Sequence, residues 1–216
     1  MTIPRFRAVL IDVDSTLCGI EGIDWLAARR GPEVAAEIAG LTERAMSGEI
    51  PLDSVYGDRL ALVRPTATEV AQLGRAYIDA LAPGAREAIF RMRGEGIALA
   101  LVSGGVRQAI RPLARELGFS DGSLHAVSLS FDESGAYVGH DATSPLATQH
   151  GKRDVCAALG LPRPLLAVGD GATDAAMREA ADAFAVYTGF VRREPVVRSA
   201  DYVVSSFRQL TDLVLP

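Results

Sequence analysis

The chain has 216 residues, of which 49% are hydrophobic and 23% charged, and its formal net charge is −5 with no basic cluster. This balance is typical of a globular protein with a sizeable core, and it speaks against nucleic acid or an anionic membrane as a partner. The longest apolar run, 97–102, is far shorter than the roughly 20 residues of a membrane span, so we expect no membrane association.

The two cysteines, Cys18 and Cys156, lie far apart and have no metal-binding spacing. They therefore imply no disulfide framework. The apolar run that follows the basic N-terminal residues is too short for a signal peptide. We expect a cytoplasmic protein with reduced thiols, present as a monomer or a homodimer.

The first predicted strand leads directly into two acidic residues. Residues 8–11 form an apolar run that is typical of a buried parallel strand, and Asp12 and Asp14 follow it. Ligands of open α/β sheets bind at the carboxyl ends of strands. The two carboxylates indicate either a functional site or a plain acidic turn.

Residues 18–82 are predicted to be helical throughout. Apolar residues recur at helical spacing in about four segments, separated by Gly31-Pro32, Gly48 and Pro51, and Thr66 or Thr68 caps the last helix. Because no strand pattern interrupts these helices, the segment predicts a small helical bundle.

From residue 83 onward, strands alternate with helices. Buried strands are predicted at 97–102 and 165–168, and shorter ones at 184–186 and 202–204. Residues 124–140 predict either a β-hairpin or a strand with a hairpin extension. The fold class is therefore α/β: a doubly wound parallel sheet in residues 1–17 and 83–216, with a four-helix cap, 18–82, inserted after the first strand.

Three strands are expected to end in polar loops at one edge of this sheet: Asp12–Asp14, Ser103-Gly104-Gly105 and 170–174, with Lys152 at the start of the helix before the third strand. Asp12, Asp170 and Asp174 sum to −3, and Lys152 returns +1. Each like-charged pair at about 4 Å costs on the order of 4 kcal/mol at an effective dielectric near 20, so the cluster needs a cation. Carboxylates without His or Cys favour Mg²⁺.

With Mg²⁺ the charges sum to zero, so a phosphate dianion becomes a favourable ligand. Ser103, the amides of Gly104 and Gly105, and Lys152 could hold its oxygens. Other motifs do not fit: no segment matches a P-loop or a dinucleotide fingerprint, and no His is placed to activate Ser103 as a triad nucleophile. Trp25 and Tyr77 fall on apolar helix faces and are expected in the core.

Four ordered segments resemble the motifs of haloacid dehalogenase superfamily phosphatases: Asp12-Val13-Asp14-Ser15-Thr16, Ser103-Gly104-Gly105, Lys152 and 169–174. Within that superfamily the chain is most similar to the phosphoserine phosphatases. That similarity lies in Glu21-Gly22-Ile23-Asp24, in 42–46 and in 59–62. The resemblance spans about residues 8–210, and it implies a Rossmann-like haloacid dehalogenase fold with a helical cap.

The resemblance implies Mg²⁺-dependent hydrolysis of O-phosphoserine to serine and phosphate. Asp12 would be the nucleophile and form an aspartyl-phosphate, while Asp14 would act first as acid and then as base. Ser103 and Lys152 would complete the catalytic group. The metal would be held by Asp12, the backbone carbonyl of Asp14, Asp170 and Asp174.

The resemblance also implies how the substrate is chosen. Glu21 would pair with the substrate ammonium, and Arg59 would bind its carboxylate bidentately. Further substrate-binding positions carried over from the family are Met46, Gly48, Ser103, Gly104 and Thr173.

The chain departs from the family pattern at Ile20, Ser47 and Leu52, which stand where the family often has a glutamate, a glycine and an aromatic residue. These changes leave the core chemistry intact and open the choice of substrate. One alternative is a phosphatase or phosphotransferase for another phosphorylated amine or hydroxy acid. A more remote one is a catalytically silent phosphoamino-acid binding protein. Asp14 argues against a dehalogenase.

Overall fold

A parallel sheet positions the chemistry of this protein. The computed structural model describes residues 4–215. In that range the main sheet has six strands in the order β3-β2-β1-β6-β7-β8, and β1 pairs in parallel with both β2 and β6. The strands are β1 Ala8–Ile11, β2 Ala98–Val106, β3 Leu124–Val127, β6 Leu165–Gly169, β7 Ala183–Tyr187 and β8 Tyr202–Val204.

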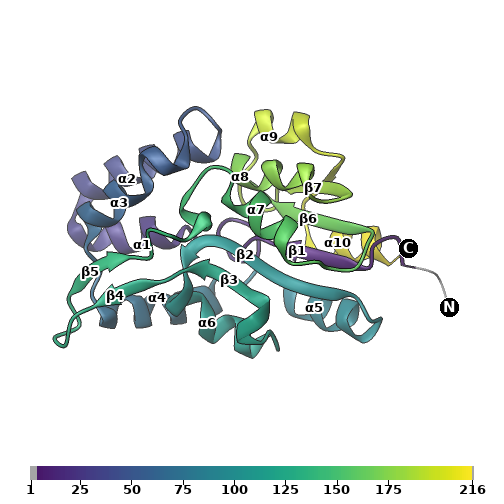
Figure 1. Cartoon of the computed structure of the whole chain (residues 1–216), viewed down its shortest axis with the longest axis horizontal. Helices are drawn as coiled ribbons and strands as arrows, with labels where there is room; N and C mark the ends of the chain where they lie inside the picture. Colours follow the sequence, from purple (N-terminus) through teal and green to yellow (C-terminus); the bar gives the residue numbers. More distant parts are fainter. Residues whose placement is uncertain (1–3, 216) are drawn as a thin grey trace.

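The sequence of the central strands follows from their burial. Each of the four residues of β1 is fully buried, and all of β6 is buried. A strand covered on both faces reads as a continuous apolar run, not as an alternating one. Figure 1 shows α7 and α8 on one side of the sheet and α5 and α6 on the other. The core helices are α5 Ala85–Gly94, α6 Arg107–Glu116, α7 Gly151–Ala158, α8 Ala172–Ala175, α9 Glu194–Ser199 and α10 Phe207–Val214.

The inserted helices between β1 and α5 are α1 Gly22–Ala27, α2 Pro32–Met46, α3 Tyr56–Val63 and α4 Ala67–Asp79. Thr66, one of the two predicted caps, closes a capping box with Glu69 at the start of α4. In Figure 1, α1, α2 and α3 gather at the end of the molecule away from both termini. One continuous cluster of buried apolar side chains runs from the sheet into these helices, so the cap packs on the core.

The predicted α/β fold with its helical insertion is confirmed, with two differences in detail. The stretch Ser103-Gly104-Gly105 was predicted to be a loop, but it lies within β2. Strand β2 continues because Val106 pairs with Val127, after a register shift that begins at Val102. Glycine and serine have low strand propensity, which is why the pattern indicates a loop.

The second difference concerns residues 124–140. Strand β3 joins the main sheet, and β4 Leu129–Phe131 pairs antiparallel with β5 Tyr137–His140 in a separate two-stranded sheet. The predicted strand with a hairpin extension is therefore the correct alternative, and the hairpin begins at 129, not at 124. No helix of the described residues is long and apolar enough to cross a membrane.

Candidate active site

The site lies where the strand order reverses. From β1 the chain builds outward through β2 and β3, and then returns to place β6 on the other side of β1. Ligands of open α/β sheets bind in the crevice at this switch point, outside the carboxyl ends of the strands. Asp12 directly follows β1, and Asp170 directly follows β6. The topology therefore brings together two acids that are 158 residues apart in the sequence.

Lys152 joins two of the predicted acids. Its Nζ donates to Oδ1 of Asp12 and to Oδ1 of Asp174, each at 2.7 Å. Burial alone would lower the pKa of this ammonium, but the attraction of Asp12 and Asp174 raises it above its ordinary value. Burial, and then repulsion from Asp174, raise the pKa of Asp12 well above its usual range. Lys152 is thus a fixed cation beside the predicted nucleophile.

Three carboxylates form a group that could hold a metal ion. Asp12, Asp170 and Asp174 each offer an oxygen, and these oxygens lie within 4.8 Å of one another. Burial, and then repulsion from Asp174, raise the pKa of Asp170 to about 7, which reflects carboxylates crowded in a dry site. Hard oxygen donors without His or Cys fit Mg²⁺. A ligand role for the backbone carbonyl of Asp14 stays a prediction.

Arg193 is a buried residue of the site that the sequence pattern did not indicate. Its guanidinium pairs with Asp170 through Nη1 and with Glu43 of α2 through Nη2, the latter at 3.0 Å. The side chain of Arg193 is only 4% exposed. Arg193 adds a cation to the cluster and Glu43 adds a carboxylate: the three aspartates and Glu43 with Lys152 and Arg193 give −4 + 2 = −2, and a bound dication would bring the sum to 0. This is the same net charge that the sequence indicated, so a phosphate dianion remains a favourable ligand.

Asp14 is held by two donors on its Oδ1. The backbone N–H of Gly22 donates at 3.0 Å, and the hydroxyl of Tyr77 donates at 2.6 Å. Burial raises the pKa of Asp14, although both hydrogen bonds lower it. Tyr77 was predicted to be a core residue, and its ring is indeed buried, but its hydroxyl reaches the site. Gly22 must be a glycine, because a Cβ there would lie 2.2 Å from the Tyr77 hydroxyl oxygen.

The bulged end of β2 forms another wall. Ser103 is fully buried, and its hydroxyl accepts a hydrogen bond from the Gly105 amide at 2.9 Å. The Gly104 carbonyl accepts one from the hydroxyl of Tyr56 at 2.8 Å. A Cβ on Gly105 would lie 2.6 Å from Oδ2 of Asp14, so the strand passes the acid at a distance that only glycine allows.

Two of the predicted substrate-binding residues, Thr173 and Gly48, differ in whether they line the pocket. Thr173, in the first turn of α8, lines the pocket, and its buried hydroxyl has no hydrogen-bond partner within residues 4–215. Gly48 follows the end of α2 with φ of 82° and is exposed. Among the described residues it is not one of those that line the pocket. Its predicted contact with substrate stays a prediction.

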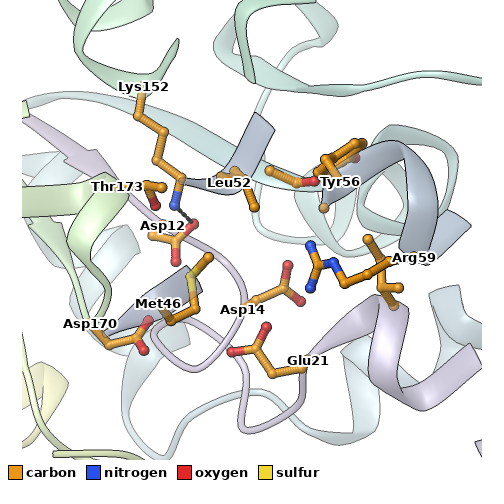
Figure 2. Close-up of a pocket in the computed structure, with 13 residues that line it drawn as sticks. Asp12, Asp14, Glu21, Met46, Leu52, Tyr56, Arg59, Lys152, Asp170 and Thr173 are labelled. Atoms are coloured by element: carbon orange, nitrogen blue, oxygen red, sulfur yellow. Dashed lines mark hydrogen bonds and ion pairs between the residues drawn. The ribbon is translucent and has the colours of Figure 1, made fainter. Parts of the chain in front are cut away.

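The cap supplies the other end of the pocket. Figure 2 shows the Arg59 guanidinium and the Glu21 carboxylate directed toward Asp14, on the side opposite Lys152 and Asp170. The hydroxyl of Ser15 donates to Glu21 at 2.6 Å. Burial, and then repulsion from Asp14, raise the pKa of Glu21 well above its usual range. The cap residues that line the pocket as a whole are Glu21, Ile23, Met46, Leu52, Tyr56 and Arg59.

The pocket thus has two chemically different ends. Acids and Lys152 at one end can hold a phosphoryl group together with a metal ion. An arginine and a glutamate at the other end can bind a carboxylate and an ammonium.

Comparison with known proteins agrees with this chemistry. A family model described as haloacid dehalogenase-like hydrolase matches residues 6–182. The phosphoserine phosphatase of Rattus norvegicus is 35% identical over 206 residues, which cover 94% of this chain and 91% of the relative. The chloroplastic phosphoserine phosphatase of Arabidopsis thaliana is 36% identical over 209 residues, which cover 94% and 70%.

A solved structure shares the whole fold. The phosphoserine phosphohydrolase-like protein from Francisella tularensis superposes with a TM-score of 0.89 at 25% identity, over 96% of this chain and 99% of that one. Agreement over nearly the full length of both chains includes the inserted helices as well as the sheet.

Proposed function

The chain belongs to the haloacid dehalogenase-like hydrolases and, within them, to the phosphoserine phosphatase family, and from this membership we infer how its site hydrolyses O-phosphoserine to serine and phosphate. The observation that carries the proposal is the two-ended pocket. Lys152 and the acids occupy the end suited to phosphate, and Arg59 with Glu21 occupies the end suited to an amino acid.

In the proposed mechanism Asp12 attacks phosphorus. Lys152 holds Oδ1 of Asp12, which leaves Oδ2 to form the bond to phosphorus while the bond from phosphorus to the serine oxygen breaks. Asp14 gives its proton to that leaving oxygen. It then takes a proton from the water that cleaves the aspartyl-phosphate, so that phosphate leaves and both acids return to their starting state.

The other residues prepare this reaction. Tyr77 and the Gly22 amide fix the orientation of Asp14, and Lys152 balances charge on the phosphoryl oxygens. Asp12, Asp170 and Asp174 would hold Mg²⁺, which when bound neutralises phosphoryl charge and aligns the group for in-line attack. We place the substrate carboxylate on Arg59 and its ammonium on Glu21, with residues 18–82 acting as the cap.

A direct assay tests the proposal. Purified protein with Mg²⁺ and phosphoserine should release inorganic phosphate, and ³²P-phosphoserine should label the wild type transiently in a rapid quench. Asp12→Asn should show neither signal. Phosphate release by Asp12→Asn would overturn the covalent mechanism, and no release by the wild type would overturn the function itself.

A related substrate is the second candidate, because Leu52 lines the pocket where the family often has an aromatic residue. A panel of phosphoserine, phosphothreonine and phosphoethanolamine, compared by kcat/KM, decides between them. If phosphoserine is preferred through its carboxylate, Arg59→Ala should remove the preference over phosphoethanolamine. The proposed location is cytoplasmic, which the two buried, free cysteines support.

A further inference from the structure

Three cap helices are joined by a chain of hydrogen bonds that ends at Arg59. Nη1 of Arg59, on α3, donates to the hydroxyl oxygen of Thr42 on α2 at 2.6 Å. The Thr42 hydroxyl in turn donates to Oδ1 of Asp24 on α1 at 2.6 Å. Among the residues that line the pocket, Arg59 is present and Thr42 and Asp24 are absent, so the chain lies behind the site.

The direction of these hydrogen bonds is fixed by chemistry. A guanidinium has five N–H donors and no acceptor, so the Thr42 oxygen must accept from Arg59. The single hydroxyl hydrogen of Thr42 is then free for Asp24, whose carboxylate only accepts when ionised. Thr42 is 3% exposed and Arg59 5%, so water does not compete easily for these groups. The hydrogen bonds therefore run in one direction only, from Arg59 through Thr42 to Asp24, which orients the Thr42 hydroxyl and restrains the Arg59 guanidinium.

This restraint determines which edge of the guanidinium stays available. Because Nη1 is bound to Thr42, the edge formed by Nε and Nη2 remains for a ligand. The Nε atom is buried and has no hydrogen-bond partner in the described part of the chain. A buried donor without a partner is costly, and two parallel N–H groups match a carboxylate bidentately. Figure 2 shows the guanidinium directed into the pocket.

We propose that Thr42 and Asp24 are positioning residues that set the substrate specificity of this enzyme: they hold the Arg59 guanidinium so that its Nε–Nη2 edge faces the substrate carboxylate. The inference rests on the proposed carboxylate-binding role of Arg59. It accounts for two residues in segments that carry the family resemblance, Asp24 and Thr42, which the reaction itself does not use. Neither touches the substrate, so both act only through Arg59.

The test is Thr42→Val, which keeps the shape of the side chain and removes the hydroxyl. We expect KM for phosphoserine to rise about tenfold, as one hydrogen bond to a charged group is weakened, with kcat nearly unchanged. Inorganic phosphate, which has no carboxylate, should keep its competitive inhibition constant. Thr42→Ser should restore KM. Thr68→Val, the same change at an exposed position of α4, is the matched control and should leave every constant unchanged.

A double-mutant cycle separates positioning from a structural role. If Thr42 acts through Arg59, the double variant Thr42→Val/Arg59→Ala should have the KM of Arg59→Ala alone. Additive effects, an unchanged KM in Thr42→Val, or an equal weakening of phosphate inhibition would each overturn the proposal. If Thr42→Val does not fold, Asp24→Asn, which keeps an oxygen acceptor, decides by the same readouts with a smaller rise in KM. Failure of wild-type turnover would instead contradict the proposed function.

Discussion

The hydroxyl of Tyr77 is one of the two hydrogen-bond donors that orient Asp14. Tyr77 is a fully buried α4 residue whose hydroxyl donates to the acid at 2.6 Å, and its ring packs among the apolar residues of the cap and core. The ring contributes to stability, and the hydroxyl contributes to the site. These two roles can be separated by removing a single oxygen atom.

We expect Tyr77→Phe to lower kcat for phosphoserine about tenfold while KM stays nearly constant. A positioned general acid and base contributes about 10²–10⁴ in rate, and an Asp14 side chain with one donor fewer should lose part of that. Steady-state kinetics measure the effect, and circular dichroism checks the fold. Tyr137→Phe on the hairpin is the control. A similar fall in kcat for both variants would show that the hydroxyl has no special role.

The sequence is least informative about where individual side chains end in the folded protein. Helical periodicity predicts that Tyr77 is buried, but it cannot tell where a polar tip on a buried ring will end. Arg193 presents the same difficulty, because it follows Arg192 in an irregular segment. In the folded chain Arg192 pairs with Glu194 at the surface, and Arg193 turns inward to Asp170. Only the position of this segment after β7, at the active edge of the sheet, could have drawn attention to it.

At the scale of elements, α4 begins with a charged cap that makes its stability depend on pH. Glu69 accepts two hydrogen bonds from the Arg30 guanidinium, at 2.6 and 2.7 Å, and one from the backbone N–H of Thr66 at 2.8 Å. The Arg30 hydrogen bonds, above all, lower the pKa of Glu69 from 4.5 to about 2. The carboxylate therefore stabilises the fold above about pH 4.5, and this contribution is lost as the pH falls toward 2.

Glu69→Gln should accordingly lower the free energy of unfolding by about 1 kcal/mol at pH 7, the size of a lost helix cap and a partly exposed ion pair. The gap between variant and wild type should close between pH 4.5 and 2. Urea unfolding at a series of pH values measures it. Glu37→Gln, at an exposed position of α2, should show little difference at any pH. A gap for Glu69→Gln that persists at pH 2 would refute the linkage.

The start of α7 depends on a glycine. A Cβ at Gly151 would lie 1.6 Å from the carbonyl oxygen of Pro145, and that backbone cannot move aside without displacing its own turn. Because Lys152 is the next residue, a shift here also moves the cation that binds Asp12. We expect Gly151→Ala to cost about 3 kcal/mol, at the upper end for overpacking, and to reduce activity in the protein that folds.

The matched control is Gly40→Ala, because nothing lies within 4 Å of the Cβ it adds in the middle of α2. Alanine should stabilise that helix by about 0.5–1 kcal/mol. Thermal unfolding of both variants gives the comparison. We expect Tm to fall in Gly151→Ala and to rise in Gly40→Ala. A Gly151→Ala protein as stable as the wild type would contradict the packing argument.

For the whole molecule, the sequence predicts the topology of the core better than its details. Buried apolar runs such as 97–102 and 165–168 alternate with helices, and right-handed crossovers then leave few possible sheets. The insertion after β1 was visible because no strand pattern occurs in 18–82. The extension of β2 through Ser103 and Gly104 could not be predicted from the sequence. It depends on pairing with β3, and local strand propensity carries no information about contacts between distant residues.

The three carboxylates that could hold a metal ion come together only in the complete fold, because β1, β6 and α8 must all be in place before these side chains meet. In the folded chain Asp12, Asp170 and Asp174 repel one another, and Lys152 and Arg193 compensate only in part. A dication that binds the folded state and not the unfolded one stabilises it by about 2.7 kcal/mol at 100 times its Kd. For a chain of this size we expect Mg²⁺ to raise Tm by about 5–10 °C over protein in EDTA.

Ionic strength must be matched with NaCl, because salt screens the same repulsion without occupying the site. The increase should be specific to Mg²⁺ and should shrink in Asp170→Asn, which loses one carboxylate of the three. Asp182→Asn, outside the group, should keep the full effect on Tm. An equal increase in Tm with NaCl alone would show that salt screening of the repulsion between the carboxylates explains the effect, and that the carboxylates do not form a Mg²⁺ site. Arg193 joins Asp170 to Glu43 of the cap. Mg²⁺ bound beside Asp170 should therefore stabilise the core and the cap together.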